Sequence, residues 1–244
     1  LNLAQRAGRR AEVAWEGLTG TFLDPPGKKV DLVLTDHADI SNGFSRVFPT
    51  NRIVIFAPPP LDGFGLPHMD EWLELVITHE LVHIFHEDYS RNLGRALRSV
   101  FGRVPLAWPF FPGSATPGWV VEGIATYYES ELTQAGRVRG SFHEMVVRTA
   151  ILEGQFEAID QTSGDSPIWP GGQRYYVYGS LFLKHLMDQQ GPEAMRTDPP
   201  FPWGWVRTSV HGLTETDRAQ LYEALGLART VVKDWLESQP QGEG

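Results

Sequence analysis

The chain of 244 residues contains no cysteine, and this absence restricts the chemistry open to the protein. Without thiols it can form no disulfide and can offer no thiolate ligand to a metal ion. Any metal site must therefore be built from histidine, aspartate and glutamate. The lack of cysteine does not decide the compartment in which the protein works.

Basic clusters and long apolar runs are also missing. The chain has 21 Lys and Arg against 30 Asp and Glu, a net charge of −9, with no run of lysines or arginines. Nucleic acid is therefore not expected as a partner, because binding to phosphate backbones depends on such positive charge. No apolar run approaches the ~18 residues of a membrane span. The longest apolar loop, residues 104–113, is interrupted by prolines. The sequence thus predicts no membrane span.

The composition that remains is that of a folded domain. Hydrophobic residues make up 41% of the chain, which is enough for a core. The length suits one domain with two lobes. The first residue is leucine rather than methionine, as expected of a processed product or a domain excised from a longer polypeptide.

Residues 78–88 read THELVHIFHED, with three histidines and a glutamate inside an apolar stretch. In a helix, His79 and His83 would lie one turn apart on the same face, about 6 Å along the axis, a spacing that one metal ion can bridge. Glu80 would be rotated by about 100° and would reach a water molecule rather than the ion. The HExxH pattern therefore indicates two zinc ligands and a general base. The alternative is a surface helix that carries histidines by chance, but burying unpartnered imidazoles is costly.

A catalytic zinc ion takes three protein ligands, so a third must come from elsewhere in the chain. Glu122, in WVVEGIATYY, is the best candidate, because a lone carboxylate on an apolar helix needs a metal ion or an arginine as its partner. A buried salt bridge is the alternative for Glu122. His86 is the rival ligand, but three ligands spread over about 10 Å of one straight helix fit a tetrahedral ion poorly. We expect His86 to have a supporting or structural role.

Hydrophobic periodicity predicts an α+β fold, in which a small sheet is packed on the HExxH helix and a mainly helical lobe follows. Residues 1–130 are expected to form the lobe with the sheet and both ligand helices, and residues 131–244 a helical lobe that completes the cleft. In the HExxH helix, Asp70 is the expected N-cap, with Glu71 in the first turn. Strands are predicted at 29–36 and 51–60, and further helices at 1–22, 117–130, 140–153, 173–190, 215–225 and 228–238.

An HExxH motif followed tens of residues later by a helical glutamate in EGIA resembles the gluzincin metallopeptidases, the group that includes thermolysin and the alanyl aminopeptidases. The run from Thr78 to Ser130 is more specifically similar to bacterial peptidase MA-like domains, some of which precede a TolB-type propeller. This resemblance covers most of residues 30–240. It implies a zincin-like fold with a mixed sheet and one zinc ion per chain, bound by His79, His83 and Glu122. It further implies cleavage of peptides or proteins, an extracytoplasmic location and additional domains in a longer parent polypeptide.

The resemblance also assigns roles to residues around the metal ion. Glu80 would take a proton from the attacking water and deliver it to the leaving amine. Aminopeptidases of this clan carry an oxyanion-stabilising tyrosine in a YxxG context, which the run from Tyr176 to Gly179 matches. Tyr176 is thus the expected oxyanion donor. Tyr175 and Tyr178 are alternates, and ordinary aromatic packing is the alternative for all three.

The sequence departs from these relatives in three places. Residues 84–121 make a longer linker than the aminopeptidases have, the GxMEN strand is absent, and Thr126 stands where thermolysin-like enzymes carry a supporting aspartate. An edge strand along Gly43–Arg46 or Arg52–Phe56 is expected to pair with an extended substrate. No convincing amine-binding acidic pair is present, which slightly favours an endopeptidase over an exopeptidase.

Two other functions remain open from the sequence. A non-catalytic binding module could retain zinc as a structural staple, although the intact Glu80 argues against it, since a purely structural site needs no base. The same chemistry could also serve an ester or a small amide, because pocket shape decides the substrate.

Overall fold

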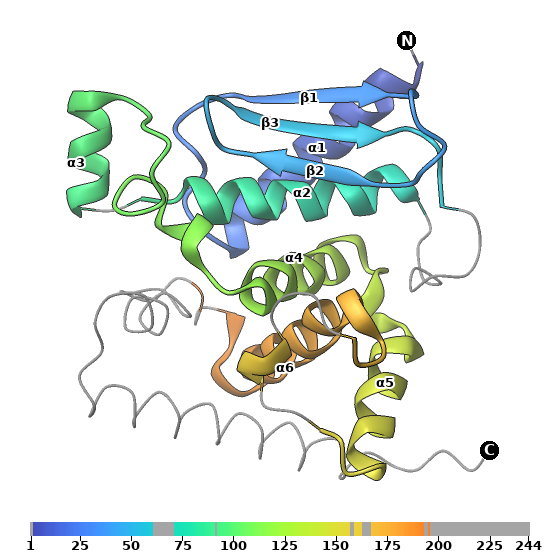
Figure 1. Ribbon diagram of the computed structural model, residues 1–244. Coiled ribbons are helices and arrows are strands. Elements are labelled where there is room, and N and C mark those ends of the chain that lie inside the picture. Colours follow the sequence, from blue (N-terminus) through green and yellow to red (C-terminus); the bar gives the residue numbers. More distant parts are fainter. Residues whose placement is uncertain are drawn as a thin grey trace. The chain divides into compact units, whose positions relative to one another are not determined.

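The structure is a computed structural model that describes residues 2–60, 71–90, 92–156, 159–162, 167–192 and 195. Within these residues the fold is α+β, as predicted, with six α-helices and one small mixed sheet (Figure 1). The helices and strands are α1 (Asn2–Thr21), β1 (Val30–Thr35), β2 (Gly43–Arg46), β3 (Asn51–Phe56), α2 (Trp72–Asp88), α3 (Asn92–Phe101), α4 (Gly118–Thr133), α5 (Ser141–Leu152) and α6 (Arg174–Gln190). Short 3-10 helices are η1 (Pro112–Ala115), η2 (Arg137–Arg139), η3 (Ile159–Thr162) and η4 (Gly171–Gln173).

The described residues gather into two compact units. One unit comprises the described residues within 2–116 and 124–140, and the other comprises those within 117–123 and 141–195. The predicted lobes, 1–130 and 131–244, stay a prediction. None of the helices in the described ranges is long and apolar enough to cross a membrane.

The sheet of the first unit has the strand order β1-β3-β2. Strand β3 pairs in parallel with β1, where Val30 lies opposite Asn51, and antiparallel with β2, where Gly43 lies opposite Ile55. Because β3 is bonded on both sides, the prediction that Arg52–Phe56 forms an edge strand is wrong. The alternative, Gly43–Arg46, is an edge strand, as is β1 on the other side of β3.

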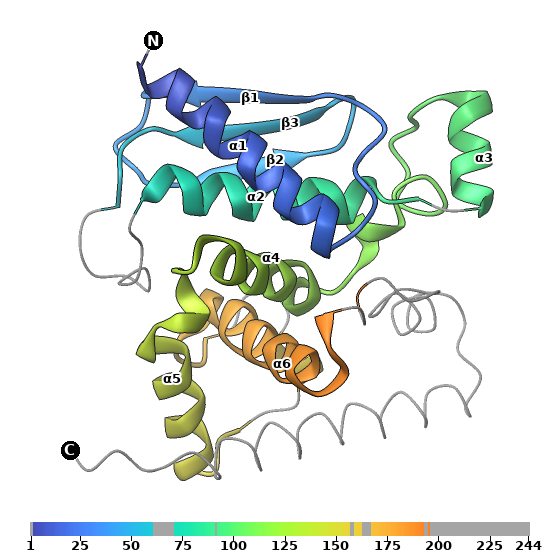
Figure 2. The ribbon, with the colours of Figure 1, turned by 180° about the vertical axis from the view of Figure 1, so that it is seen from behind.

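Helices α1 and α2 pack together on one side of this sheet, and α2 also contacts β2 and β3 (Figures 1 and 2). Ile53 and Ile55 are buried while Val54 between them is only partly buried, which matches a strand with one covered face. Trp15 of α1 meets Phe85 of α2 edge-on, with ring centroids 4.9 Å apart. Nearly every residue of α2 is buried. A helix buried on all its sides belongs in the interior, and α2 is the central helix of this unit.

The start of α2 differs from the expected cap. The helix begins at Trp72, and Glu71 precedes it without a side-chain cap hydrogen bond. Glu71 instead pairs with Arg6, at 2.6 Å, and with Arg10 of α1. The hydrogen bond from Arg6 lowers the pKa of Glu71, against the opposing effect of its burial. Asp70, the expected N-cap, lies outside the described residues.

In the second unit, α5 and α6 confirm the helices predicted at 140–153 and 173–190. Trp119, in the first turns of α4, meets Phe182 of α6 edge-on, with ring centroids 5.6 Å apart. His143 Nδ1 lies 3.1 Å from Ser180 Oγ inside this packing. The helices predicted at 215–225 and 228–238 lie outside the described residues, and α3 was not predicted.

A buried ionic network holds the C-terminal end of α2. The carboxylate of Asp88 contacts both Arg98 and Arg103, the latter at 3.1 Å. Asn51 Nδ2 donates to Asp88 Oδ2 at 3.0 Å, and Arg103 Nη2 donates to Asn51 Oδ1 at 2.5 Å. The network ties the end of α2 to the start of β3 and to the segment that follows α2. Substituting one of these groups alone would leave a buried charge without its partner, which is costly.

We expect the substitution Asp88→Asn to lower the free energy of unfolding by about 3 kcal/mol, because it leaves two largely buried guanidinium groups without their shared charge. Urea denaturation monitored by circular dichroism measures the change. The control is Asp31→Asn, which breaks the exposed pair with Arg52 at 3.3 Å and should cost less than about 0.5 kcal/mol. Equal losses in the two variants would contradict a structural role for the network.

Candidate metal centre

The helix α2 brings the two histidines of the HExxH motif together as its periodicity predicted. His79 and His83 are buried one turn apart, and their Nε2 atoms lie 3.1 Å from each other. The two rings are nearly perpendicular. Two zinc–nitrogen bonds of about 2.0 to 2.1 Å at the tetrahedral angle would place these atoms about 3.3 Å apart. The pair therefore has the separation that one small metal ion requires.

Glu122 joins this pair from α4. One ligand atom each from His79, His83 and Glu122 can be chosen so that all three lie within 4.8 Å of one another. The predicted group of two imidazoles and one carboxylate is thus close enough to hold a metal ion. Such a donor set suits several divalent transition metal ions.

His86, the rival ligand, does not belong to this group. Its side chain is fully buried near the C-terminal end of α2. Burial, with a smaller contribution from nearby His83, lowers the pKa of His86 to about 3. A neutral imidazole in the core agrees with the structural role expected for this residue.

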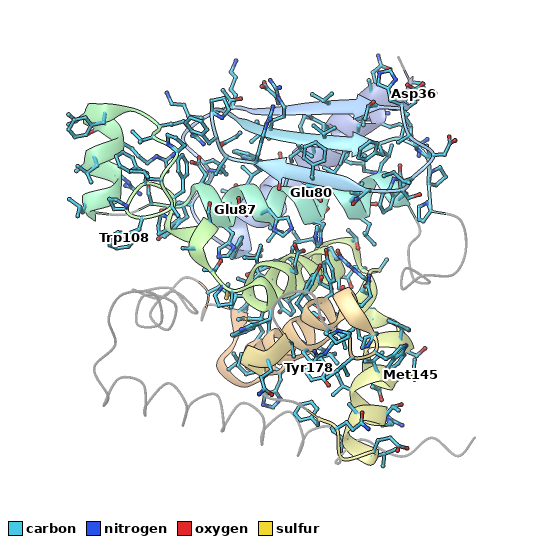
Figure 3. The ribbon with its side chains drawn as sticks, in the orientation of Figure 1. Asp36, Glu80, Glu87, Trp108, Met145 and Tyr178 are labelled. Carbon is cyan, nitrogen blue, oxygen red and sulfur yellow. The ribbon has the colours of Figure 1, made fainter. Side chains whose placement is uncertain are left out.

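Glu80 lies on α2 on the side next to strand β2 (Figure 3). A β-carbon at Gly43 of β2 would lie 2.7 Å from Val76 Cγ2 and 3.1 Å from Glu80 Oε1. Any other residue at position 43 would force the Val76 and Glu80 side chains to move, so Gly43 lets the edge strand lie directly beside the predicted base. The spacing of HExxH contains no information about this contact, which depends on how the sheet packs on α2.

Sequence reasoning missed a carboxylate that supports the candidate ligands. Glu129 is fully buried on α4, and its Oε2 accepts a hydrogen bond from His79 Nδ1 at 2.7 Å. This bond assigns the proton to Nδ1 and leaves the Nε2 lone pair for a metal ion. Glu129 lies seven residues after Glu122, two turns along the same helix face. Thr126, the position compared with thermolysin-like enzymes, is buried and supplies no carboxylate.

Arg137 holds Glu129 in its ionised form. Its Nε donates to Glu129 Oε1 at 2.8 Å and its Nη2 to Oε2 at 2.7 Å, a two-pronged pairing. Burial acts to raise the pKa of Glu129, but the charge and hydrogen bonds of Arg137, together with the bond from His79, lower it to about 2. Arg137 Nη2 also lies 3.0 Å from His79 Nδ1. Both atoms carry protons in this arrangement, so each donates to Glu129 and they form no hydrogen bond with each other.

A glycine turn returns the chain over the end of α4 so that Arg137 reaches Glu129. Gly136 has φ of +83°, which disfavours any residue with a side chain. A β-carbon there would also lie 2.7 Å from Ser130 Oγ. Ser130 Oγ accepts a hydrogen bond from the Val138 backbone at 3.1 Å and secures the turn. A glutamate at i+7 from Glu122, followed by Gly-Arg after the helix, is the sequence signal that could have identified this support.

The tyrosines near the start of α6 have different surroundings. Tyr178 is buried and stacks on Phe156, with ring centroids 5.3 Å apart, and burial raises the pKa of Tyr178. This stacking is the packing role named as the alternative. The rings of Tyr175 and Tyr176 lie 4.6 Å from each other, and both side chains are half-buried. The oxyanion role of Tyr176 stays a prediction.

Comparisons of the chain with protein-family models, curated proteins and solved structures find no match. The gluzincin resemblance therefore stays a prediction that depends on the motif residues themselves.

The two candidate third ligands can be distinguished by metal affinity. We expect Glu122→Ala to weaken zinc binding by more than about 100-fold, because it removes a ligand, and His86→Asn to weaken it by less than about 10-fold, below the range typical of residues that support ligands. Zinc dissociation constants from competition with a chromogenic chelator measure both. Loss of metal in the His86 variant alone would instead indicate three histidine ligands and a purely structural Glu122.

The variant Glu129→Gln tests the support of His79. We expect zinc affinity to fall by about 10 to 100-fold, because an amide holds the imidazole less firmly than a carboxylate does. The control is Glu131→Gln on the same helix, whose exposed side chain pairs with Arg139 at 3.4 Å and should leave the affinity unchanged. An affinity of the Glu129 variant within about 2-fold of the control would contradict the role.

Proposed function

We propose that the protein is a zinc-dependent metallopeptidase of the gluzincin type, with a zincin-like fold and Glu80 as the general base. The observation that carries this proposal is the convergence of His79, His83 and Glu122 within 4.8 Å, beside the glutamate of the HExxH motif. A structural site could share the three ligands, but it would not need a base at the second position of the motif.

Zinc is the ion we assign to the site, because two neutral imidazoles and one carboxylate are typical of catalytic zinc. When bound, zinc supplies Lewis acidity, which acidifies a water molecule and polarises a carbonyl group. The protein's part is to hold the three ligand side chains in position. Glu129 keeps the His79 proton on Nδ1, where it does not compete with metal binding.

Glu80 moves the proton in the proposed reaction. Its position next to His79 turns its carboxylate by about 100° around the helix, so it would reach a bound water molecule rather than act as another ligand. The carboxylate accepts a proton from the attacking water and returns it to the amine that leaves. Tyr176 is proposed to donate a hydrogen bond to the oxyanion, by resemblance to the YxxG tyrosines of the clan.

The proposed substrate is an extended peptide paired with β2. This strand lies at one of the two edges of the sheet, and Gly43 brings it into contact with Glu80. Edge strands bind extended peptides through backbone hydrogen bonds, which give affinity with little dependence on side chains. An internal peptide bond can be presented in this way, in keeping with the slight preference for an endopeptidase.

Two measurements on the purified chain test the proposal. Metal analysis should find about one zinc per chain, and a peptide library analysed by mass spectrometry should show cleavage that a chelator abolishes. Glu80→Gln should keep its zinc and lose at least ~100-fold in hydrolysis, because the amide cannot accept a proton. The control Glu87→Gln, two turns further along α2, should retain activity.

The other outcomes separate the alternatives. Absence of zinc after metal addition would overturn the proposal. Bound zinc without turnover of any peptide would favour a binding module with a structural metal ion. Full activity of the Glu80 variant would mean that another group acts as the base.

A further inference from the structure

Helix α3 turns its apolar side to solvent. Leu93, Leu97 and Val100 follow helical spacing and lie on one face. The side toward the protein instead carries Gly94, where a β-carbon would lie 2.4 Å from the Pro109 carbonyl oxygen, and Arg98, which donates to the Asp88 carbonyl at 2.7 Å. A surface helix of a globular protein normally buries its apolar face, and α3 does the reverse.

The loop after α3 extends this apolar surface. We call helix α3 and the loop that follows it, residues 92–109, the α3 hairpin. Helix α3 itself lies beyond the C-terminal end of α2 in both views (Figures 1 and 2), while Arg103 of the loop after it contacts Asn51 at the start of β3. Five of the hairpin's large apolar side chains are exposed: Leu93 at 59%, Val100 at 74%, Phe101 at 66%, Leu106 at 53% and Trp108 at 47%. So many exposed apolar side chains in one short segment indicate an interaction surface.

The charge of this segment differs in sign from that of the whole protein. Between Asp88 and Glu122 the sequence contains four arginines, at 91, 95, 98 and 103, and neither aspartate nor glutamate, although the chain has a net charge of −9. Arg98 and Arg103 contact Asp88, whereas the side chain of Arg95 is exposed. The hairpin therefore combines exposed apolar and aromatic side chains with local positive charge.

We propose that the α3 hairpin inserts its apolar side into the surface of a membrane that contains anionic lipids. Amphipathic segments with aromatic and aliphatic residues on one side and arginine beside them bind at this interface. A standard protein interface takes about 20–30 residues on each side, whereas this segment exposes five large apolar side chains. A lipid surface needs no complementary shape. The inference does not depend on the metal centre or on the proposed peptidase activity.

Flotation with phospholipid vesicles tests the proposal on the full chain. Vesicles of phosphatidylcholine with added phosphatidylglycerol should bind the protein, and vesicles of phosphatidylcholine alone should bind it more weakly. Added salt should weaken the first interaction, because it screens the charges at the surface.

A triple variant and a matched control locate the surface. The variant Leu93→Ser, Val100→Ser, Phe101→Ser should lower the vesicle partition coefficient at least ~10-fold, because three side chains lose their apolar burial. The control Val13→Ser, Leu152→Ser, Trp169→Ser changes residues of similar exposure elsewhere, at 59%, 73% and 60%, and should bind as the parent does. Neither variant removes a core residue, so circular dichroism should be unchanged.

The absence of cysteine allows a direct test of insertion. A single Val100→Cys carries an environment-sensitive fluorophore at one known place, and its emission should shift to shorter wavelength when anionic vesicles are added. The same label at Leu152→Cys should not shift.

Several results would overturn the proposal. These are no binding to anionic vesicles, equal binding to neutral ones, equal loss of binding in the two triple variants, or an unshifted label at residue 100. A dimer in solution that the α3 variant abolishes, without vesicle binding, would instead assign the hairpin to a second copy of this chain.

Discussion

The hydrogen bond from His79 Nδ1 to Glu129 is the interaction on which the candidate metal centre depends. An imidazole can present either nitrogen, and a metal site requires that one of them keep a free lone pair in a known direction. The buried carboxylate of Glu129 selects that nitrogen, and the two-pronged contact with Arg137 keeps the carboxylate ionised despite its burial. A turn at Gly136 makes the contact with Arg137 possible. The arrangement thus places a ligand, its support and a counter-charge in one connected network.

Because helix α2 is buried almost completely, each of its sides contacts a different part of the structure. One side packs on α1, where Trp15 meets Phe85, and another contacts β2 and β3. The two HExxH histidines project from it toward Glu122 of α4. Its last residue, Asp88, anchors the segment that leads to the α3 hairpin. A rigid central helix holds the ligands at a constant separation, which a loop would not do as well.

Local patterns predicted most of the elements but not all of their relations. The strands at β1 and β3 and the helices α1, α2, α4, α5 and α6 follow from apolar periodicity with turn residues between them. Apolar periodicity did not predict α3, because the apolar side of this helix faces solvent rather than the core. The loop after it also resembles an apolar linker. Strand order was also beyond the sequence. Both Gly43–Arg46 and Arg52–Phe56 read as edge strands, and only the pairing of β3 with two neighbours separates them.

The sequence by itself determined that His79 and His83 share a helix face, with Glu80 turned away from them, because these relations follow from 3.6 residues per turn. It also restricted the third ligand to a carboxylate or an imidazole, since the chain lacks cysteine. Only the tertiary structure decided that Glu122 approaches that pair, that Glu129 and Arg137 support His79, and that β2 lies against Glu80. Each of these contacts joins segments that are far apart in the chain or follow an irregular turn, and no local period relates such positions. Their proximity arises from packing, which depends on the whole chain at once.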